Sequence, residues 1–163
     1  MKSCVNNEEY EFLRLDHQLC FPMYACARQV VRRYTPLLKP LGLTYTQYIV
    51  FMALWEEDGI TTTEICRKLY LDTGTVTPLL KKLEAQGYIK RERNSEDERV
   101  IEISLTKKGW EMRDKVKHIP QQIACCVTLE QDEIQAFYGL LYKLLDSLSE
   151  SGQEAADDQE RQG

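Results

Sequence analysis

The clearest alternation of apolar and polar positions lies within residues 61–106. It predicts a helix over about 63–70, a break at 71–74 and a second helix over about 75–86. A threonine at the start of the first helix is a candidate N-cap, and Gly87 is a left-handed stop after the second. Two helices joined by a short break form a helix-turn-helix.

The second helix separates its side chains by face. Its apolar residues recur at the i, i+3, i+4, i+7 spacing of a buried stripe: Val76, Leu79, Leu80 and Leu83. Hydroxyl and lysine side chains remain for the outer face: Thr73, Thr75, Thr77, Lys81 and Lys82. Such side chains suit contacts to DNA bases and phosphates, but a solvated helix face explains them equally well. Pro78 is expected in the first turn, where its missing N–H is tolerated.

A β-ribbon is predicted next, with strands at 88–93 and 99–105 around a turn at 94–98. Its tip is expected to carry three arginines, Arg91, Arg93 and Arg99. Arginine suits a narrow minor groove, and Asp97 could brace Arg99 through a salt bridge. A plain surface hairpin explains the charges as well, but not why the ribbon directly follows a helix-turn-helix. The combination predicts a winged helix-turn-helix.

Helical periodicity continues before this module. Residues 1–12 are expected to be a flexible N-terminus. A helix over about 16–38 should begin or be interrupted at Pro22, because proline lacks an N–H, and should end near Pro36. Thr44 is expected to open another helix that runs to the turn near residue 57.

The C-terminal part is also predicted to be helical. Thr106 should cap a long helix that is kinked at Pro120 and runs toward Cys126. A capping box at 128–131 opens a last helix to about 148. Residues 150–163 are rich in Ser, Gly, Gln and acids and are expected to be a disordered acidic tail.

The predicted fold class is therefore mainly α with a small β-wing. Residues 13–150 form one domain, with the winged helix-turn-helix at about 44–106 and flanking helices at about 13–40 and 107–149. One small module cannot bury the apolar faces of both flanking regions. A homodimer through these helices is expected, and it would present two recognition helices to half-sites one DNA turn apart. A monomeric helical domain is the alternative.

Composition limits the function. The 163 residues carry a net charge of −5, and hydrophobic residues make up 43%. Residues 61–108 hold 10 basic and 8 acidic side chains, or +2, which leaves −7 elsewhere and favours a local basic footprint on an acidic body. The sequence has no run of 18 apolar residues and no signal-peptide pattern, so a cytoplasmic protein without a membrane partner is expected.

Six cysteines supply the candidate chemistry: Cys4, Cys20, Cys26, Cys66, Cys125 and Cys126. Without an export signal the default is reduced thiols, so an oxidised pair would be a redox device. The spacing with the two histidines indicates no zinc site, and neither a metal nor another cofactor is expected. An N-terminal helix position near Cys20 would favour its thiolate, although a cysteine on an apolar stripe is more often inert.

Four stretches resemble the MarR family of repressors, and within it the OhrR type that responds to organic hydroperoxides. They are 15–21 (LDHQLCF), 34–48 (from YTPLL to LTYTQY), 71–80 (LDTGTVTPLL) and 97–99 (DER), and the similarity covers about 13–150. The resemblance implies a dimeric repressor that loses DNA affinity when a cysteine is oxidised by an organic hydroperoxide. The reactive cysteine in LCF is Cys20 here.

The resemblance also implies the partners of Cys20. Tyrosine hydroxyls that hydrogen-bond the thiolate match Tyr34 and Tyr45, and Tyr24 lies one turn from Cys20. The pair at 125–126 places the chain among members with a resolving cysteine, and family spacing favours Cys125, with Cys126 as the alternate. The two are expected to share a helix, so that only one faces Cys20. Cys26 and Cys66 are expected to be core thiols.

Three functions remain open from the sequence. The first is a repressor that binds operator DNA when reduced and releases it through an intersubunit disulfide between Cys20 and Cys125. The second is a MarR-type repressor released by a small phenolic ligand. The third is a thiol peroxidase, in which the wing and the recognition helix would have no role.

Overall fold

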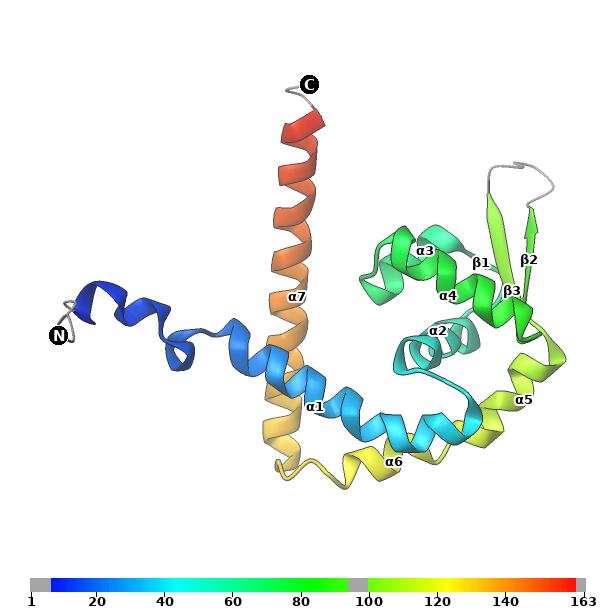
Figure 1. Ribbon diagram of the computed structural model, residues 1–163, viewed down its shortest axis with the longest axis horizontal. Coiled ribbons are helices and arrows are strands. Elements are labelled where there is room, and N and C mark those ends of the chain that lie inside the picture. The colour runs from blue at the N-terminus through cyan, green and yellow to red at the C-terminus, as the bar shows by residue number, and fades with distance from the viewer. Residues whose placement is uncertain (1–6, 94–99, 161–163) are drawn as a thin grey trace, which may run out of the picture. The chain divides into compact units, whose positions relative to one another are not determined.

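The computed structural model describes residues 7–93 and 100–160, which form two units, 1–124 and 125–163 (Figure 1). The first unit contains the 3-10 turns η1 (Asn7–Leu13), η2 (Leu15–His17) and η3 (Lys39–Leu41). Its helices are α1 (Cys20–Leu38), α2 (Tyr45–Glu56), α3 (Thr62–Leu69), α4 (Thr73–Ala85), α5 (Lys107–Val116) and α6 (Ile119–Ala124). Its strands are β1 (Ile60–Thr61), β2 (Ile89–Arg93) and β3 (Ile101–Leu105). The helix of the second unit is α7 (Gln131–Glu160).

The mainly helical fold with a β-wing is confirmed. The wing is an antiparallel sheet in the order β1-β3-β2. Its short strand β1 was not predicted from the sequence, because two residues give no alternation. Thr61 ends β1 and also caps α3, so the sheet and the helix-turn-helix are joined at one residue.

Side-chain caps fix where the central helices begin. Capping boxes open α2 at Thr44, as predicted, and α3 at Thr61, so that α3 starts one residue before the predicted position with a threonine as its cap. Asp72 opens α4 because its Oδ1 accepts the Thr75 N–H at 2.8 Å. The helix therefore starts two residues before the predicted position. Pro78 consequently lies inside α4 and not in its first turn, where the sequence had placed it.

The core of the first unit lies between α2, α3, α4 and the sheet. Its fully buried side chains include Phe51, Leu54, Ile65, Leu80, Leu83 and Ile103. The predicted stripe of α4 is confirmed, with Leu79 half-buried at its edge. Phe51 stacks on Trp55 with ring centroids 5.3 Å apart and meets Tyr88 edge-on at 5.4 Å. This packing holds α2 against the segment that joins α4 to the wing.

The N-terminal segments agree with the prediction only in part. Residues 7–13 form the 3-10 turn η1, where a flexible end was expected. Pro22 lies in the first turn of α1, which confirms that it begins the helix. Pro36 lies in the last turn of α1, near the helix end as expected, and Gly42 supplies the left-handed residue after η3.

The C-terminal helices also differ. The single kinked helix expected after Thr106 is two helices, α5 and α6, and Pro120 is the second residue of α6, where proline is tolerated. Glu130, rather than Thr128, precedes α7. The Glu130 N–H donates a hydrogen bond to the Glu133 carboxylate at 2.9 Å. The helix α7 continues past residue 150 to Glu160, where a disordered tail was expected, because Glu, Gln and Ala are strong helix formers.

Candidate functional site

The outer face of α4 carries the predicted DNA-binding side chains. Thr73, Thr75, Lys81 and Lys82 are exposed and Thr77 is half-buried. The Thr75 hydroxyl donates a hydrogen bond to Asp72 Oδ2 at 2.7 Å. This bond, together with the bond from the Thr75 N–H, lowers the pKa of the Asp72 carboxyl. Thr75 is thus oriented by the helix cap, while the two lysines point to solvent. This arrangement could contact DNA as expected.

The wing arginines are divided. Arg91 lies in the middle of β2, opposite Ile103, and its Nη1 is 3.5 Å from Glu84 Oε2 on α4. Its placement at the ribbon tip was therefore wrong, because the strand extends two residues beyond it. Arg93 is the last residue of β2 and is exposed. The predictions for Asp97 and Arg99 fall outside the described residues.

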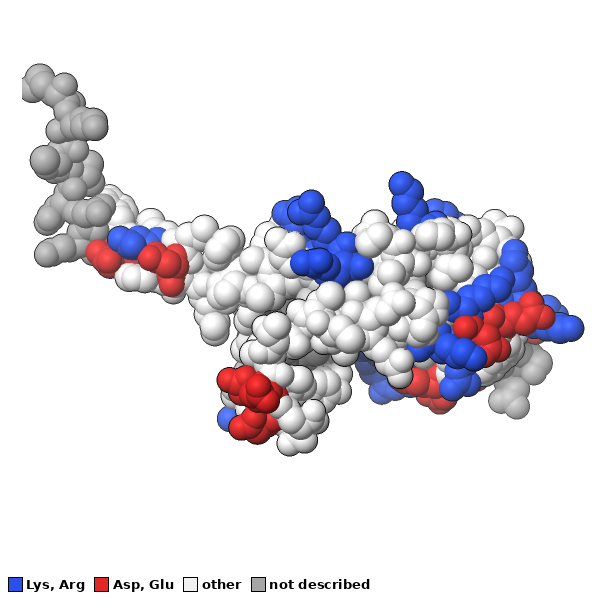
Figure 2. Space-filling view, turned by 90° about the horizontal axis from the view of Figure 1, so that it is seen from below, with Lys and Arg blue, Asp and Glu red and all other residues white. Residues whose placement is uncertain are grey.

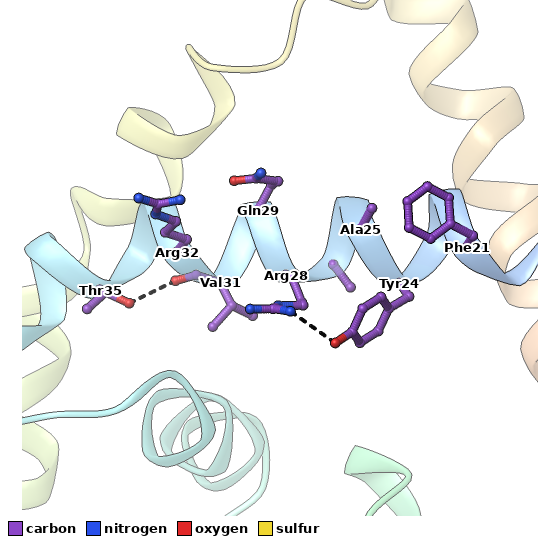
Figure 3. Close-up of a pocket in the computed structure, with 9 residues that line it drawn as sticks. Phe21, Tyr24, Ala25, Arg28, Gln29, Val31, Arg32 and Thr35 are labelled. Carbon is purple, nitrogen blue, oxygen red and sulfur yellow. Dashed lines mark hydrogen bonds between the residues drawn. The ribbon is translucent and has the colours of Figure 1, made fainter. Parts of the chain in front are cut away.

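Cys20 is the first residue of α1 and is exposed. This confirms its predicted position at a helix N-terminus. A groove of about 700 Å³ runs along α1 from the neighbouring Phe21 to Thr35 (Figure 3). Tyr24, one helical turn from Cys20, accepts a hydrogen bond from Arg28 Nη1 at 3.1 Å. Arg28 thereby joins the predicted site, and its i+4 spacing from Tyr24 was the sequence signal for it.

The predicted tyrosines Tyr34 and Tyr45 meet, with ring centroids 4.9 Å apart. Tyr48 completes the cluster at 5.7 Å from Tyr34; its place one helical turn after Tyr45 was the signal that the sequence analysis missed. Burial raises the pKa of Tyr34 and Tyr45. Both phenols are therefore protonated at neutral pH and can donate hydrogen bonds to an anion.

Cys20 and Tyr34 lie on the same helix, α1, and cannot meet within one chain. Their 14-residue separation spans roughly 20 Å at 1.5 Å per residue. The structure therefore does not bring the predicted thiol and the tyrosine pair together in a single subunit. A site that contains both requires the tyrosines of a second copy.

The other cysteines fall into different environments. Cys66 is buried as predicted, and burial raises the pKa of its thiol. Cys26 is exposed, so its assignment to the core was wrong. Cys125 and Cys126 are exposed in a turn between α6 and α7, and not on a helix as expected. The helical argument for choosing between these two thiols therefore does not apply.

Charge and composition add three observations on the described residues. Basic side chains gather over the middle of the view in Figure 2, where Figure 1 places α1, whose sequence holds three arginines and no acid. In residues 7–93 and 100–160, no cluster of three or more metal-binding side chains is present. Within the same ranges, no helix has the length and hydropathy needed to cross a membrane.

Comparisons with known proteins agree with this geometry. A family model described as transcriptional regulator SarA/Rot matches residues 32–116. The organic hydroperoxide resistance transcriptional regulator of Bacillus subtilis (strain 168) is 39% identical over 140 residues, which cover 86% of this chain and 95% of that protein.

Solved structures of AbfR from Staphylococcus epidermidis are similar as well. The reduced protein bound to DNA has a TM-score of 0.71 and 39% identity, covering 87% of this chain and 99% of that chain. The disulfide-formed protein has a TM-score of 0.58 and 37% identity, covering 90% and 99%.

Proposed function

This chain belongs to the MarR family of winged-helix transcriptional regulators, in its OhrR type, and from that premise we propose that it is a repressor regulated by cysteine oxidation. The reduced homodimer binds operator DNA, and an organic hydroperoxide releases it by oxidising Cys20. The observation that carries the proposal is the exposed Cys20 thiol at the N-terminus of α1 in a chain that also presents a recognition helix. The solved forms of AbfR, reduced on DNA and disulfide-formed, support it.

Two chains complete the sensor site in this proposal. Tyr34 and Tyr45 of one subunit donate hydrogen bonds to the Cys20 thiolate of the other, because the length of α1 prevents an intrachain contact. The thiolate is the nucleophilic form of cysteine, and these bonds position it for attack on the peroxide. The groove along α1 beside Tyr24 is open to the organic part of the peroxide.

The chemistry is a two-electron oxidation of sulfur. The Cys20 thiolate attacks the terminal peroxide oxygen, the O–O bond breaks, and the organic fragment leaves as an alcohol after it takes a proton. The sulfenic acid then condenses with a second thiol, which forms an S–S bond and releases water. We assign the second thiol to Cys125 of the other subunit, with Cys126 as the alternate. The bridge moves the two recognition helices away from operator spacing.

Operator binding by Cys20→Ser tests the proposal. The variant should bind DNA as tightly as the wild-type protein, yet stay bound when a stoichiometric alkyl hydroperoxide is added, whereas the wild-type protein is released and recovers with dithiothreitol. Fluorescence anisotropy measures both steps, on DNA from upstream of the protein's own gene. Release of Cys20→Ser by peroxide would contradict the assignment of the sensor.

A non-reducing gel of Cys125→Ser and Cys126→Ser identifies the second thiol. Loss of the dimer band in Cys125→Ser alone is expected, and loss in Cys126→Ser alone would reassign the role. The groove along α1 also suits a small aromatic ligand, the alternative inducer. Wild-type protein that ignores peroxide but releases DNA with a phenolic compound would favour that function.

A further inference from the structure

A second cleft lies between the recognition helix α4, the start of α3 and the strands of the wing. It has a volume of about 300 Å³, and its apolar walls include Ile101. Its polar lining consists of three threonines at the start of α3, one threonine of α4 and one arginine of β2: Thr61, Thr62, Thr63, Thr77 and Arg91. Thr77 and Arg91 were each predicted as DNA contacts, and the cleft brings them together with the threonines that open α3.

Arg91 holds an unused donor in this cleft. The side chain is 17% exposed, and its Nε is buried without a hydrogen-bond partner. The Glu84 carboxylate is 3.5 Å from Nη1, a distance too long for a strong charge-assisted hydrogen bond. A buried N–H without an acceptor costs free energy, and because Arg91 lines the cleft, a shift of its guanidinium would bring this donor to an acceptor there.

The surrounding groups suit an oxyanion. Thr62 and Thr63 are the first residues of α3, where helix N–H groups have no intrahelical acceptor. The neighbouring Glu64 carboxylate is already bound, since its Oε2 accepts from the Thr61 N–H at 2.7 Å and from the Thr61 hydroxyl at 2.8 Å. Hydroxyl donors around a guanidinium match the two charged non-bridging oxygens of a backbone phosphate.

We propose that this cleft binds one phosphate of the DNA backbone in each half-site, an inference that rests on the DNA-binding function proposed above. In a winged helix the recognition helix enters the major groove and the wing reaches the adjacent minor groove. The sugar–phosphate strand that separates these grooves must then cross between α4 and the wing, where the cleft lies. The ligand is therefore a phosphodiester of DNA, and its role is to position the protein independently of base sequence.

The salt dependence of DNA binding tests the charge in the cleft. Arg91→Gln should weaken binding to operator and unrelated duplexes by the same factor, about tenfold, and reduce the slope of log K against log salt by about 0.9. Arg91→Lys should keep the slope while losing affinity, because it keeps the charge but lacks the Nε donor. Glu84→Gln should tighten binding. As the matched control, Lys117→Gln removes an exposed cation just after α5 and should change neither quantity.

Neutral methylphosphonate substitutions, introduced one backbone position at a time, locate the phosphate. Wild-type protein should lose about tenfold at one position per half-site, and Arg91→Gln should show no further loss there. If circular dichroism shows that Arg91→Gln does not fold, the methylphosphonate profile of Thr77→Val is compared with that of the wild-type protein instead. An equal loss in wild-type and variant proteins at every position, or an unchanged salt slope, would overturn the proposal.

A titration of the DNA-free protein with inorganic phosphate distinguishes a phosphate of the DNA backbone from a free phosphate ion as the ligand of the cleft. Saturable binding that disappears in Arg91→Gln, together with a flat methylphosphonate profile, would assign the cleft to a free anion and overturn the DNA assignment. Failure of the wild-type protein to bind any operator would remove the proposed function itself. Operator binding with a flat profile would remove only the phosphate site.

Discussion

The helices α1 and α2 are adjacent in sequence but bury their side chains to very different extents. Six of the 12 residues of α2 are buried inside the first unit, whereas only Leu38 is buried among the 19 residues of α1. The same contrast holds for α7, whose Phe137 is 49% exposed and Leu140 65% exposed. The DNA-binding part is therefore complete in one chain, whereas α1 and α7 carry apolar surface that a second copy would cover in the proposed homodimer.

The largest effect is expected for a core side chain in the DNA-binding part, whose core is complete within one chain. Phe51→Ala removes a fully buried ring that contacts Trp55 and Tyr88, and it should lower the free energy of unfolding by about 3–5 kcal/mol. Urea denaturation measures the change. The neighbouring Met52, 41% exposed on the same helix, serves as the control, and Met52→Ala should cost less than about 1 kcal/mol. Equal losses in the two variants would mean that burial does not distinguish these positions.

An intermediate effect is expected for the same phenylalanine-to-alanine change on α7, whose apolar side chains are exposed in one chain. Phe137→Ala should weaken dimerisation by about 2–4 kcal/mol, because large aromatic side chains dominate interface energies. Sedimentation over a range of concentrations measures the dimer, and operator binding should decrease in parallel. Gln135→Ala, on the same exposed helix, provides a polar control. A dimer constant unaffected by Phe137→Ala would place the interface elsewhere.

The smallest effect is expected for a contact that would link the two regions. Tyr45→Phe removes one phenol hydroxyl and should slow the reaction of Cys20 with hydroperoxide about tenfold, equivalent to about 1.4 kcal/mol. Stopped-flow measurement of sulfenic acid formation tests this rate, with exposed Tyr70→Phe as the control. Because burial raises the pKa of Tyr45, its phenol stays protonated at pH 7 and pH 9. The ratio of wild-type to variant rates should therefore be the same at both pH values.

The winged helix could be predicted from sequence because its signals are local. The stripe of α4, the threonine caps at Thr44 and Thr61, and the alternation in β3 each require only a few neighbouring residues. The start of α4 was missed because Asp72 and the threonines after it compete as caps, and only the structure shows which oxygen accepts the Thr75 N–H. Strand β1 is short and depends on its pairing with β3, which is a long-range contact.

The candidate site was predicted less completely for the same reason. Cys20 could be placed at the start of a helix, but its distance from Tyr34 follows only from the unbroken length of α1, which continues through Pro36. The exposure of Cys26 and the turn at Cys125 depend on where neighbouring helices end. Arg91 seemed equivalent to Arg93 in sequence, whereas the register of β2 places it in the middle of the strand, opposite Ile103.

The unbroken helix α1 has a consequence for the stoichiometry of the response. In the proposed dimer, each copy of α1 would contribute its cysteine end to one sensor site and its tyrosine end to the other. A displacement of the helix at an oxidised site would then be transmitted along about 20 Å of rigid backbone to the site that is still reduced. The two thiols would form a mechanically coupled pair, and a titration with peroxide should show release of DNA before half of the cysteines are consumed.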